Sequence, residues 1–201
     1  MTGKEYNMKI LITGSKGMLG YDLVKRLRTD HTVVGIDVDN FDIVDKKIVD
    51  YIEHKKPAII FHLAAFTNVD EAEVEKEKAY NINVKGTENI VKAAKQLDIP
   101  IVFISTDYVF DGSKDSSYNE TDVTNPINFY GKTKEIAEGI VKNTLKKYFI
   151  VRTSWLFGKN GKNFVKTHSP YLSIAVNTVF IILPIVVNVA GTILQERLLK
   201  F

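Results

Sequence analysis

The chain has 201 residues, of which 45% are hydrophobic and 25% charged, a composition typical of one folded domain or of a domain plus a fragment. Its net charge of +3 is spread along the chain, which excludes the clustered basic stripe of a nucleic-acid-binding protein. Because there is no cysteine, disulfide scaffolds, thiolate metal sites and cysteine nucleophiles are excluded as well. The four histidines lack the spacing of a zinc site, so no metal is expected.

Short apolar runs alternate with longer helical patterns over the first three quarters of the chain. In chain order we expect a strand at 9–13, a helix at 19–28, a strand at 32–37, a helix at 45–54, a strand at 58–63, one long helical region at 71–97, a strand at 101–105, a helix at 130–147 and a strand at 149–153. The near-continuous apolar character of the strands indicates burial on both faces of a sheet. The predicted fold class is therefore α/β, with a Rossmann-like doubly wound parallel sheet.

A glycine-rich loop, GSKGMLG at 14–20, lies between the first strand and the first helix. Glycines permit a tight turn and let backbone N–H groups approach a pyrophosphate at the N-terminus of the helix. The spacing is GxxGxxG rather than the commoner GxGxxG, and a plain strand–helix turn is the alternative interpretation. The position directly after a buried strand favours phosphate binding.

An acidic residue, Asp37, ends the second strand roughly 20 residues after the glycine loop, where a carboxylate can accept a hydrogen bond from an adenosine ribose. The alternative is a solvated acid at a strand end. A carboxylate there would repel a 2′-phosphate and favour NADH over NADPH. Lys46 and Lys47 could weaken that preference, so NADPH or NADH is the expected cofactor.

The strongest catalytic signal is the pair Tyr130 and Lys134, which share one face of the predicted helix. A tyrosine hydroxyl has a pKa of about 10, and a nearby ammonium is expected to move that pKa toward the working range. Thr106, at the carboxyl end of the 101–105 strand, could bind the carbonyl oxygen that Tyr130 protonates. A chance YxxxK spacing and a capping threonine are the alternative interpretations.

Six segments follow one another in an order that carries a family resemblance: GSKGMLG, HLAAFTNVD, NVKGT, STDYVFDG, YGKTK and RTSWLFG. Over residues 8–167 this succession resembles the extended short-chain dehydrogenase/reductase family and, within it, the dTDP-4-dehydrorhamnose reductases. The resemblance implies NAD(P)H-dependent reduction of the C4 keto group of dTDP-4-dehydro-L-rhamnose to dTDP-L-rhamnose. Because residues 1–8 carry no apolar signal-peptide core, a cytoplasmic location is expected.

The resemblance also implies residue roles. The implied catalytic residues are Thr106, Tyr130 and Lys134, and Asn83 matches a structural or proton-relay position. The implied cofactor-binding residues are Gly14, Gly17, Met18, Leu19, Gly20, Asp37, Asp42, Ile43, Ala65, Phe66, Thr67, Tyr130 and Lys134. The implied substrate-binding residues are Thr106, Asp107 and Trp155.

Two other functions are compatible with the same segments. One is a different extended short-chain nucleotide-sugar enzyme, such as an epimerase or a dehydratase. Dehydratases usually carry an acidic pair beside the catalytic threonine, whereas Asp107 is followed by Tyr108. The other is a non-catalytic nucleotide-binding regulatory subunit.

The family pattern stops near residue 167, and the C-terminal segment has a different composition. We expect 8–167 to form the NAD(P)-binding domain with the catalytic residues, and the family's C-terminal substrate domain to be largely missing. Between Lys166 and Glu196 there is no charged Lys, Arg, Asp or Glu. The atypical apolar tail, 168–201, is interpreted as frame-shifted sequence, as a membrane segment over 171–194, or as a buried part of the core.

Overall fold

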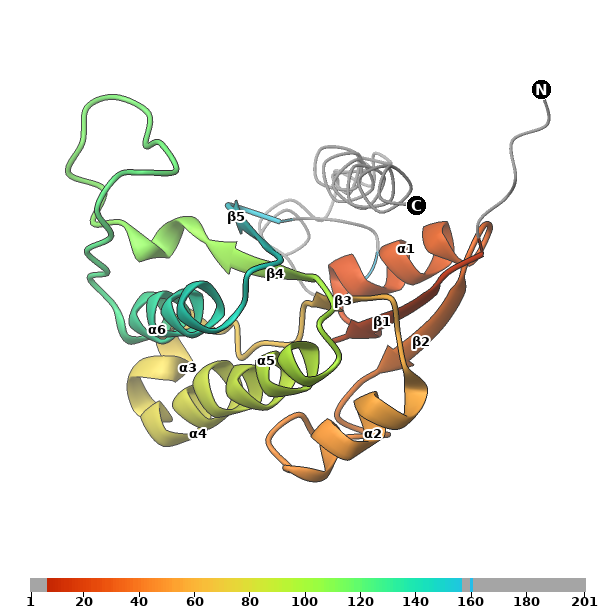
Figure 1. Cartoon of the computed structure of the whole chain (residues 1–201). Helices are drawn as coiled ribbons and strands as arrows, with labels where there is room; N and C mark the ends of the chain where they lie inside the picture. Colours follow the sequence, from red (N-terminus) through yellow and green to blue (C-terminus); the bar gives the residue numbers. More distant parts are fainter. Residues whose placement is uncertain (1–6, 157–159, 161–201) are drawn as a thin grey trace, which may run out of the picture.

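The computed structural model describes residues 7–156 and residue 160 of the chain. Within them, five strands form one sheet in the order β2-β1-β3-β4-β5, and every neighbouring pair is parallel (Figure 1). The strands are β1 Lys9–Thr13, β2 Thr32–Ile36, β3 Ile59–His62, β4 Ile101–Thr106 and β5 Tyr148–Thr153. The predicted α/β class with a doubly wound parallel sheet is confirmed. Successive strands are added on one side of β1 up to β2 and on the other side from β3 onward. Such sheets bind ligands at this switch point, between β1 and β3.

Helices cover both faces of the sheet. They are α1 Met18–Leu27, α2 Lys47–Lys55, α3 Val69–Val74, α4 Lys76–Tyr80, the π-helix η1 Asn81–Gly86, α5 Thr87–Gln96, the 3-10 helix η2 Asp107–Val109 and α6 Phe129–Thr144. Helix α1 lies on one face, and α2, α5 and α6 lie on the other (Figure 1). Ile10 and Ile12 of β1 pack with Leu23 of α1, whereas Leu11 belongs to the core on the opposite face with Ile90 of α5. Both faces are buried, which explains the continuous apolar runs of the strands.

The helical region expected over 71–97 is interrupted at Glu75. The backbone leaves helical geometry at Glu75, with φ −96° and ψ 51°, and the chain then passes through the π-helical turn η1. This turn carries Asn83, whose amide accepts a hydrogen bond from the backbone of Phe66 and donates one to the Thr133 hydroxyl. The sequence from 71 to 80 favours helix throughout, so local propensity carries no signal for the break. Among the other elements the largest difference is at the end of α6, expected at 147 and observed at Thr144.

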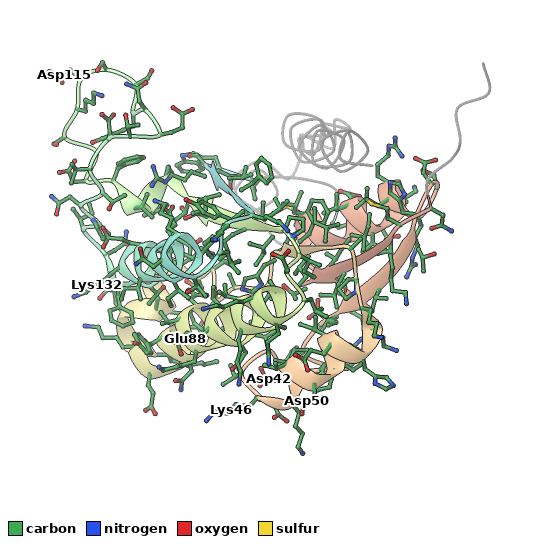
Figure 2. The ribbon with its side chains drawn as sticks, viewed as in Figure 1. Asp42, Lys46, Asp50, Glu88, Asp115 and Lys132 are labelled. Atoms are coloured by element: carbon green, nitrogen blue, oxygen red, sulfur yellow. The ribbon has the colours of Figure 1, made fainter. Side chains whose placement is uncertain are left out.

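A long loop between η2 and α6 projects from the sheet, with Asp115 at its tip (Figure 2). The carboxylate of Asp111 holds together the part of this loop nearest the sheet. It accepts hydrogen bonds from the Ser113 backbone, the Tyr118 hydroxyl and the Asn125 amide. These hydrogen bonds, first that of the Ser113 backbone, hold the pKa of Asp111 well below its usual value. The backbone N–H of Asn125 then donates to the Val109 carbonyl at 2.9 Å, which returns the chain to the sheet edge before α6 begins.

The predictions for the apolar tail, 168–201, fall outside the described residues. Within residues 7–156 and 160, no helix is both long enough and apolar enough to cross a membrane.

Candidate active site

A cleft of about 830 Å³ lies at the carboxyl edge of the sheet. Parallel strands end there together, and open α/β sheets bind their ligands at this edge. The predicted cofactor residues that line the cleft are Gly14, Gly17, Met18, Leu19, Gly20, Asp37, Asp42, Ile43, Ala65, Thr67, Tyr130 and Lys134. Phe66 does not line it, because its side chain packs against the cluster of Ala72, Ala79 and Tyr130.

The backbone conformation of the glycine loop between β1 and α1 leaves no room for side chains at Gly14 and Gly20. Gly14 has φ +67°, and a Cβ there would lie 2.7 Å from the backbone nitrogen of Ala64. A Cβ on Gly20 would lie 2.0 Å from the Gly14 carbonyl oxygen. Gly17 precedes the first turn of α1, which contains no acidic residue. The N-terminus of α1 therefore meets the cleft without a competing carboxylate, which is the arrangement that binds anions.

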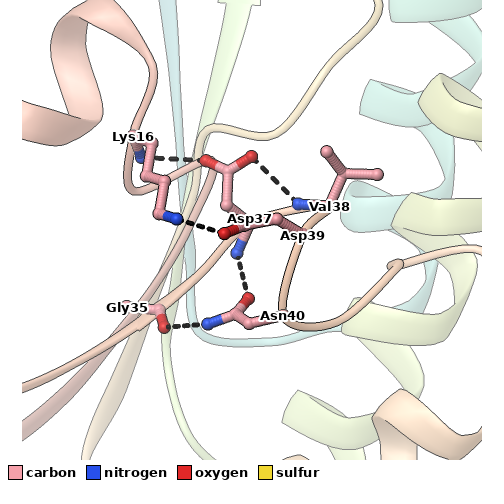
Figure 3. Close-up of polar contacts among 6 residues, drawn as sticks. All are labelled: Lys16, Gly35, Asp37, Val38, Asp39 and Asn40. Atoms are coloured by element: carbon pink, nitrogen blue, oxygen red, sulfur yellow. Dashed lines mark hydrogen bonds and ion pairs between the residues drawn. The ribbon is translucent and has the colours of Figure 1, made fainter.

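Asp37 lies directly after β2, and its carboxylate is held by backbone donors (Figure 3). One oxygen accepts from the Lys16 backbone N–H at 2.8 Å and the other from the Val38 backbone N–H at 2.9 Å. Asn40 braces the same turn: its amide accepts from the Asp37 backbone and donates to the Gly35 carbonyl. The carboxylate is thus fixed at the cleft wall, and each oxygen retains a lone pair for a ribose hydroxyl.

The cation near this carboxylate is Lys16, from the glycine loop itself. Its ammonium pairs with the Asp39 carboxylate, and the side chains of both residues are more than half exposed (Figure 3). Lys46 and Lys47, expected to weaken the repulsion of a 2′-phosphate, do not line the cleft, and Figure 2 shows Lys46 at the outer margin of the fold. Lys46 caps and Lys47 begins α2, a helix that packs on α5, so the two lysines lie outside the cleft wall.

Tyr130 and Lys134 lie on the first turns of α6, at the opposite end of the cleft. The side chain of Asn128 caps this helix by accepting from the Gly131 backbone N–H at 2.7 Å. Tyr130 is 9% exposed and Lys134 is 2% exposed. The Lys134 ammonium donates to the Ile104 carbonyl of β4 at 2.7 Å, so the lysine is anchored to the strand that presents Thr106. Thr106, Tyr130 and Lys134 all line the cleft.

The environment shifts the pKa values of both helix residues. Burial raises the pKa of Tyr130 to about 12, against a hydrogen bond with Thr106 that lowers it. Burial lowers the pKa of Lys134 to about 7, against the attraction of Glu138 that raises it. The expectation that a nearby ammonium brings the pKa of Tyr130 toward 7 is therefore wrong, because the effect of burial on this pKa dominates. The phenol stays protonated at neutral pH, and the lysine titrates there.

Asp107 and Trp155 extend the cleft beyond Thr106. The Asp107 carboxylate accepts from the Thr106 hydroxyl at 3.1 Å and from the Ser154 hydroxyl at 2.8 Å. These bonds join the ends of β4 and β5. Trp155 is 68% exposed, so its side chain is not part of the core. All three residues predicted to contact substrate, Thr106, Asp107 and Trp155, thus line the cleft.

His62 has no part in the cleft. It is buried, and its ring nitrogens lie 2.7 Å from the Thr13 hydroxyl and 3.0 Å from the Thr87 hydroxyl, which ties β1, β3 and α5 together. Burial, with the nearby Lys134 charge, lowers the pKa of His62 to about 3. In the portion of the chain described, no group of three or more His, Asp or Glu side chains could hold a metal ion.

Sequence reasoning missed part of the cleft lining. The additional lining residues are Lys16, Val38, Phe41, Leu63, Ala64, Val69, Ile82, Ile104, Ser105, Tyr108, Thr153 and Leu156. Lys16 carried a usable signal, since it lies inside the glycine loop. The apolar residues carried none, because a side chain at a strand end has the same composition whether it faces a ligand or the core.

The fold and the cleft define a Rossmann-like α/β domain with a glycine loop at one end of the site and a Tyr-Lys pair at the other. Residues 8–174 match the family model described as RmlD substrate binding domain. The chain belongs to this family, and the resemblance carried by the six sequence segments is confirmed.

Several curated relatives of this chain are named dTDP-4-dehydrorhamnose reductases. The dTDP-4-dehydrorhamnose reductase of Aggregatibacter actinomycetemcomitans is 43% identical over 162 residues, which are 79% of this chain and 55% of that protein. Among solved structures, the Bacillus anthracis dTDP-4-dehydrorhamnose reductase in complex with NADP has a TM-score of 0.78 and 42% identity, covering 81% of this chain and 58% of that one.

The Clostridium acetobutylicum dTDP-4-dehydrorhamnose reductase has a TM-score of 0.82 and 37% identity, covering 91% of this chain and 71% of that one. The chain spans about half the length of the curated relatives it matches.

Proposed function

We propose that residues 8–167 form the cofactor-binding and catalytic domain of an NAD(P)H-dependent reductase, and that its reaction is reduction of the C4 keto group of dTDP-4-dehydro-L-rhamnose to dTDP-L-rhamnose. One observation carries the proposal: Thr106, Tyr130 and Lys134 border the same cleft as the glycine loop and Asp37. Asp37, at one end of this cleft, suits the adenosine ribose of a dinucleotide. The acid–base pair Tyr130 and Lys134, at the other end, suits the nicotinamide. The similarity to named reductases supports the substrate class.

The residues present fit a dinucleotide cofactor. Any Cβ at Gly14 or Gly20 would fill the space in which the loop turns close to β3 and α1. The N-terminus of α1 would hold the pyrophosphate, and Asp37 would accept from the adenosine ribose. When bound, the cofactor supplies a hydride. NADPH and NADH both remain candidates, since Asp37 favours a free ribose and Lys16 favours a phosphate.

Tyr130 would act as proton donor. Its hydroxyl stays protonated because burial raises its pKa to about 12, so it can give a proton to the substrate oxygen as the carbonyl carbon is reduced. Thr106 would hold that oxygen beside Tyr130. The Lys134 ammonium would stabilise the tyrosinate that remains, which then regains a proton from solvent. Asp107 and Trp155 would contact the nucleotide-sugar at the open side of the cleft.

The test is an assay of the purified chain with dTDP-4-dehydro-L-rhamnose and either NADPH or NADH, together with cofactor binding by calorimetry. Turnover with loss of the absorbance of the reduced nicotinamide is the expected result. Cofactor binding without turnover would favour the regulatory subunit, and dehydration or epimerisation of a nucleotide-sugar would favour another extended short-chain enzyme. Absence of cofactor binding would reject the proposal altogether.

Replacing Asp37 with Ala should change the cofactor preference. Removing a fixed charged acceptor should weaken NADH binding by about tenfold, whereas NADPH, whose 2′-phosphate is repelled by the carboxylate, should lose little or gain affinity. Asp50→Ala is the matched control, because Asp50 is exposed on α2, lies outside the cleft and changes the net charge equally. Calorimetric Kd values for both cofactors check this. Equal losses for the two cofactors would show that Asp37 does not contact the ribose.

A further inference from the structure

A buried ion pair lies directly behind Lys134. Glu138 is 2% exposed and accepts two hydrogen bonds from the Arg152 guanidinium, at 2.9 Å from Nε and 2.7 Å from Nη2. The carboxylate oxygen that accepts from Nη2 also accepts from the Lys142 ammonium at 3.0 Å. Burial would raise the pKa of Glu138, but hydrogen bonds from Arg152 and Lys142 outweigh it, and the pKa stays below its usual value. The carboxylate is therefore charged across the neutral range.

The pair is aligned with the candidate catalytic residues. Tyr130, Lys134 and Glu138 follow one another at intervals of four along α6, so they share one face of the helix. Arg152 pairs with Ser105 in the β4–β5 register, and Lys134 donates to the carbonyl of the preceding residue, Ile104. Lys134 thus contacts β4 one residue before Ser105, the register partner of Arg152.

We propose that Glu138 and Arg152 are positioning residues for this reductase site: the Glu138 carboxylate keeps the buried Lys134 ammonium charged, and Arg152 limits how strongly it does so. This inference rests on the proposed function for its catalytic meaning. A buried ammonium without a nearby anion loses its proton readily. The Glu138 carboxylate, one helical turn away, supplies that anion, and the Arg152 guanidinium that binds it partly cancels its negative charge.

Other charged groups around Lys134 do not replace this effect. His62 of β3 is neutral, since its pKa is far below 7. Asp107 of η2 is engaged by Thr106 and Ser154, and its charge acts on Tyr130. Tyr130 is uncharged at neutral pH. Glu138 is accordingly the acidic group that raises the pKa of Lys134, opposing the burial that lowers it to about 7.

The measurement is the titration of Lys134 by NMR of the full chain labelled with ¹³C at lysine Cε, with Lys134→Met used to assign the signal. The wild-type midpoint should lie near 7. Glu138→Gln should lower the midpoint by about one pH unit, and Arg152→Met should raise it by about one unit, because the first removes an anion and the second removes a competing cation. Glu138→Asp, which keeps the charge, should restore most of the wild-type value.

Opposite signs for the two variants separate this role from a structural one. A pair that merely fastened α6 to β5 would, when broken from either side, loosen the site and shift the lysine in the same direction. Shifts of the same sign, or no shift in Arg152→Met, would overturn the proposal. Should Glu138→Gln fail to fold, the direction in which Arg152→Met shifts the Lys134 midpoint still tests the proposal. Lys142→Met is the matched surface control and should move the midpoint by less than about 0.3 units, because solvent screens its half-exposed charge.

The titration needs neither substrate nor cofactor, so its outcome is independent of whether the chain turns over. If turnover is found, the pH at which its rate falls on the alkaline side should rank the variants in the same order as the Lys134 midpoints. The ammonium is lost as pH rises through the pKa of Lys134, so the fall should begin at lower pH in Glu138→Gln and at higher pH in Arg152→Met. If the variants reduce the substrate with unshifted pH–rate profiles, the proposed function stands and the positioning role of Glu138 and Arg152 is rejected.

Discussion

Tyr130→Phe should reduce kcat for the ketone by about 100-fold or more, because it removes the proton donor while keeping the ring. The Kd of the cofactor should change by no more than about twofold, since the ring and its contacts remain. The edge-to-face contact with Tyr108, at 5.9 Å between ring centroids, survives the change. Stopped-flow or steady-state loss of the reduced nicotinamide absorbance measures the first quantity, and calorimetry measures the second.

Tyr148→Phe is the matched control for this experiment. Tyr148 begins β5, lies outside the cleft and loses the same single oxygen, so its kcat should equal that of the wild-type chain. Activity in Tyr130→Phe above about a tenth of the wild-type value would mean that another group donates the proton. Equal losses in both variants would point to a general effect on the fold.

Gly131→Ala should destabilise the chain by about 2 kcal/mol or more, because overpacking against backbone cannot be relieved by a side-chain rotation. A Cβ at this position would lie 2.1 Å from the Tyr108 carbonyl oxygen. The start of α6 would have to move away from η2, and Tyr130 would move away from Thr106. We expect loss of activity together with the loss of stability, measured by urea unfolding and by the reductase assay.

Gly139→Ala provides a control on the same helix. A Cβ there meets no atom within 4 Å, so the substitution should stabilise α6 by about 0.5–1 kcal/mol through helix propensity alone. Activity should be unchanged. Destabilisation of similar size in both variants would show that α6 tolerates no added methyl group, and the close approach at Gly131 would then have no special meaning.

The candidate site was largely predictable where its chemistry is tied to a strand end or to a helix period. Strands 9–13 and 101–105 are short apolar runs, so their carboxyl ends and the residues that follow them could be located from the sequence. Tyr130 and Lys134 are four apart, and the helix that carries them made their shared face predictable. Asp37 could be placed at a strand end because the spacing from the glycine loop sets its position relative to the phosphate.

The break at Glu75 and the π-turn at 81–86 could not be predicted in this way. The break lies in the stretch 71–80, whose residues favour helix, and the turn is stabilised by contacts of Asn83 with Phe66 and Thr133, which are distant in sequence. Phe66 was assigned to the cofactor site, yet the structure packs its side chain on a cluster with Tyr130. Which side of a loop faces a ligand depends on the neighbouring elements, and periodicity carries no information about them.

The sequence by itself determined the alternation of strands and helices, the glycine loop and the spacing of the acid–base pair, because these depend on local propensity and on residue type. The tertiary structure decided the protonation states. Burial places the pKa of Tyr130 near 12 and that of Lys134 near 7, and the charge of Glu138 on α6 opposes the lowering of the lysine pKa. Desolvation and charge act through space, so they become visible only when residues from different elements are brought together.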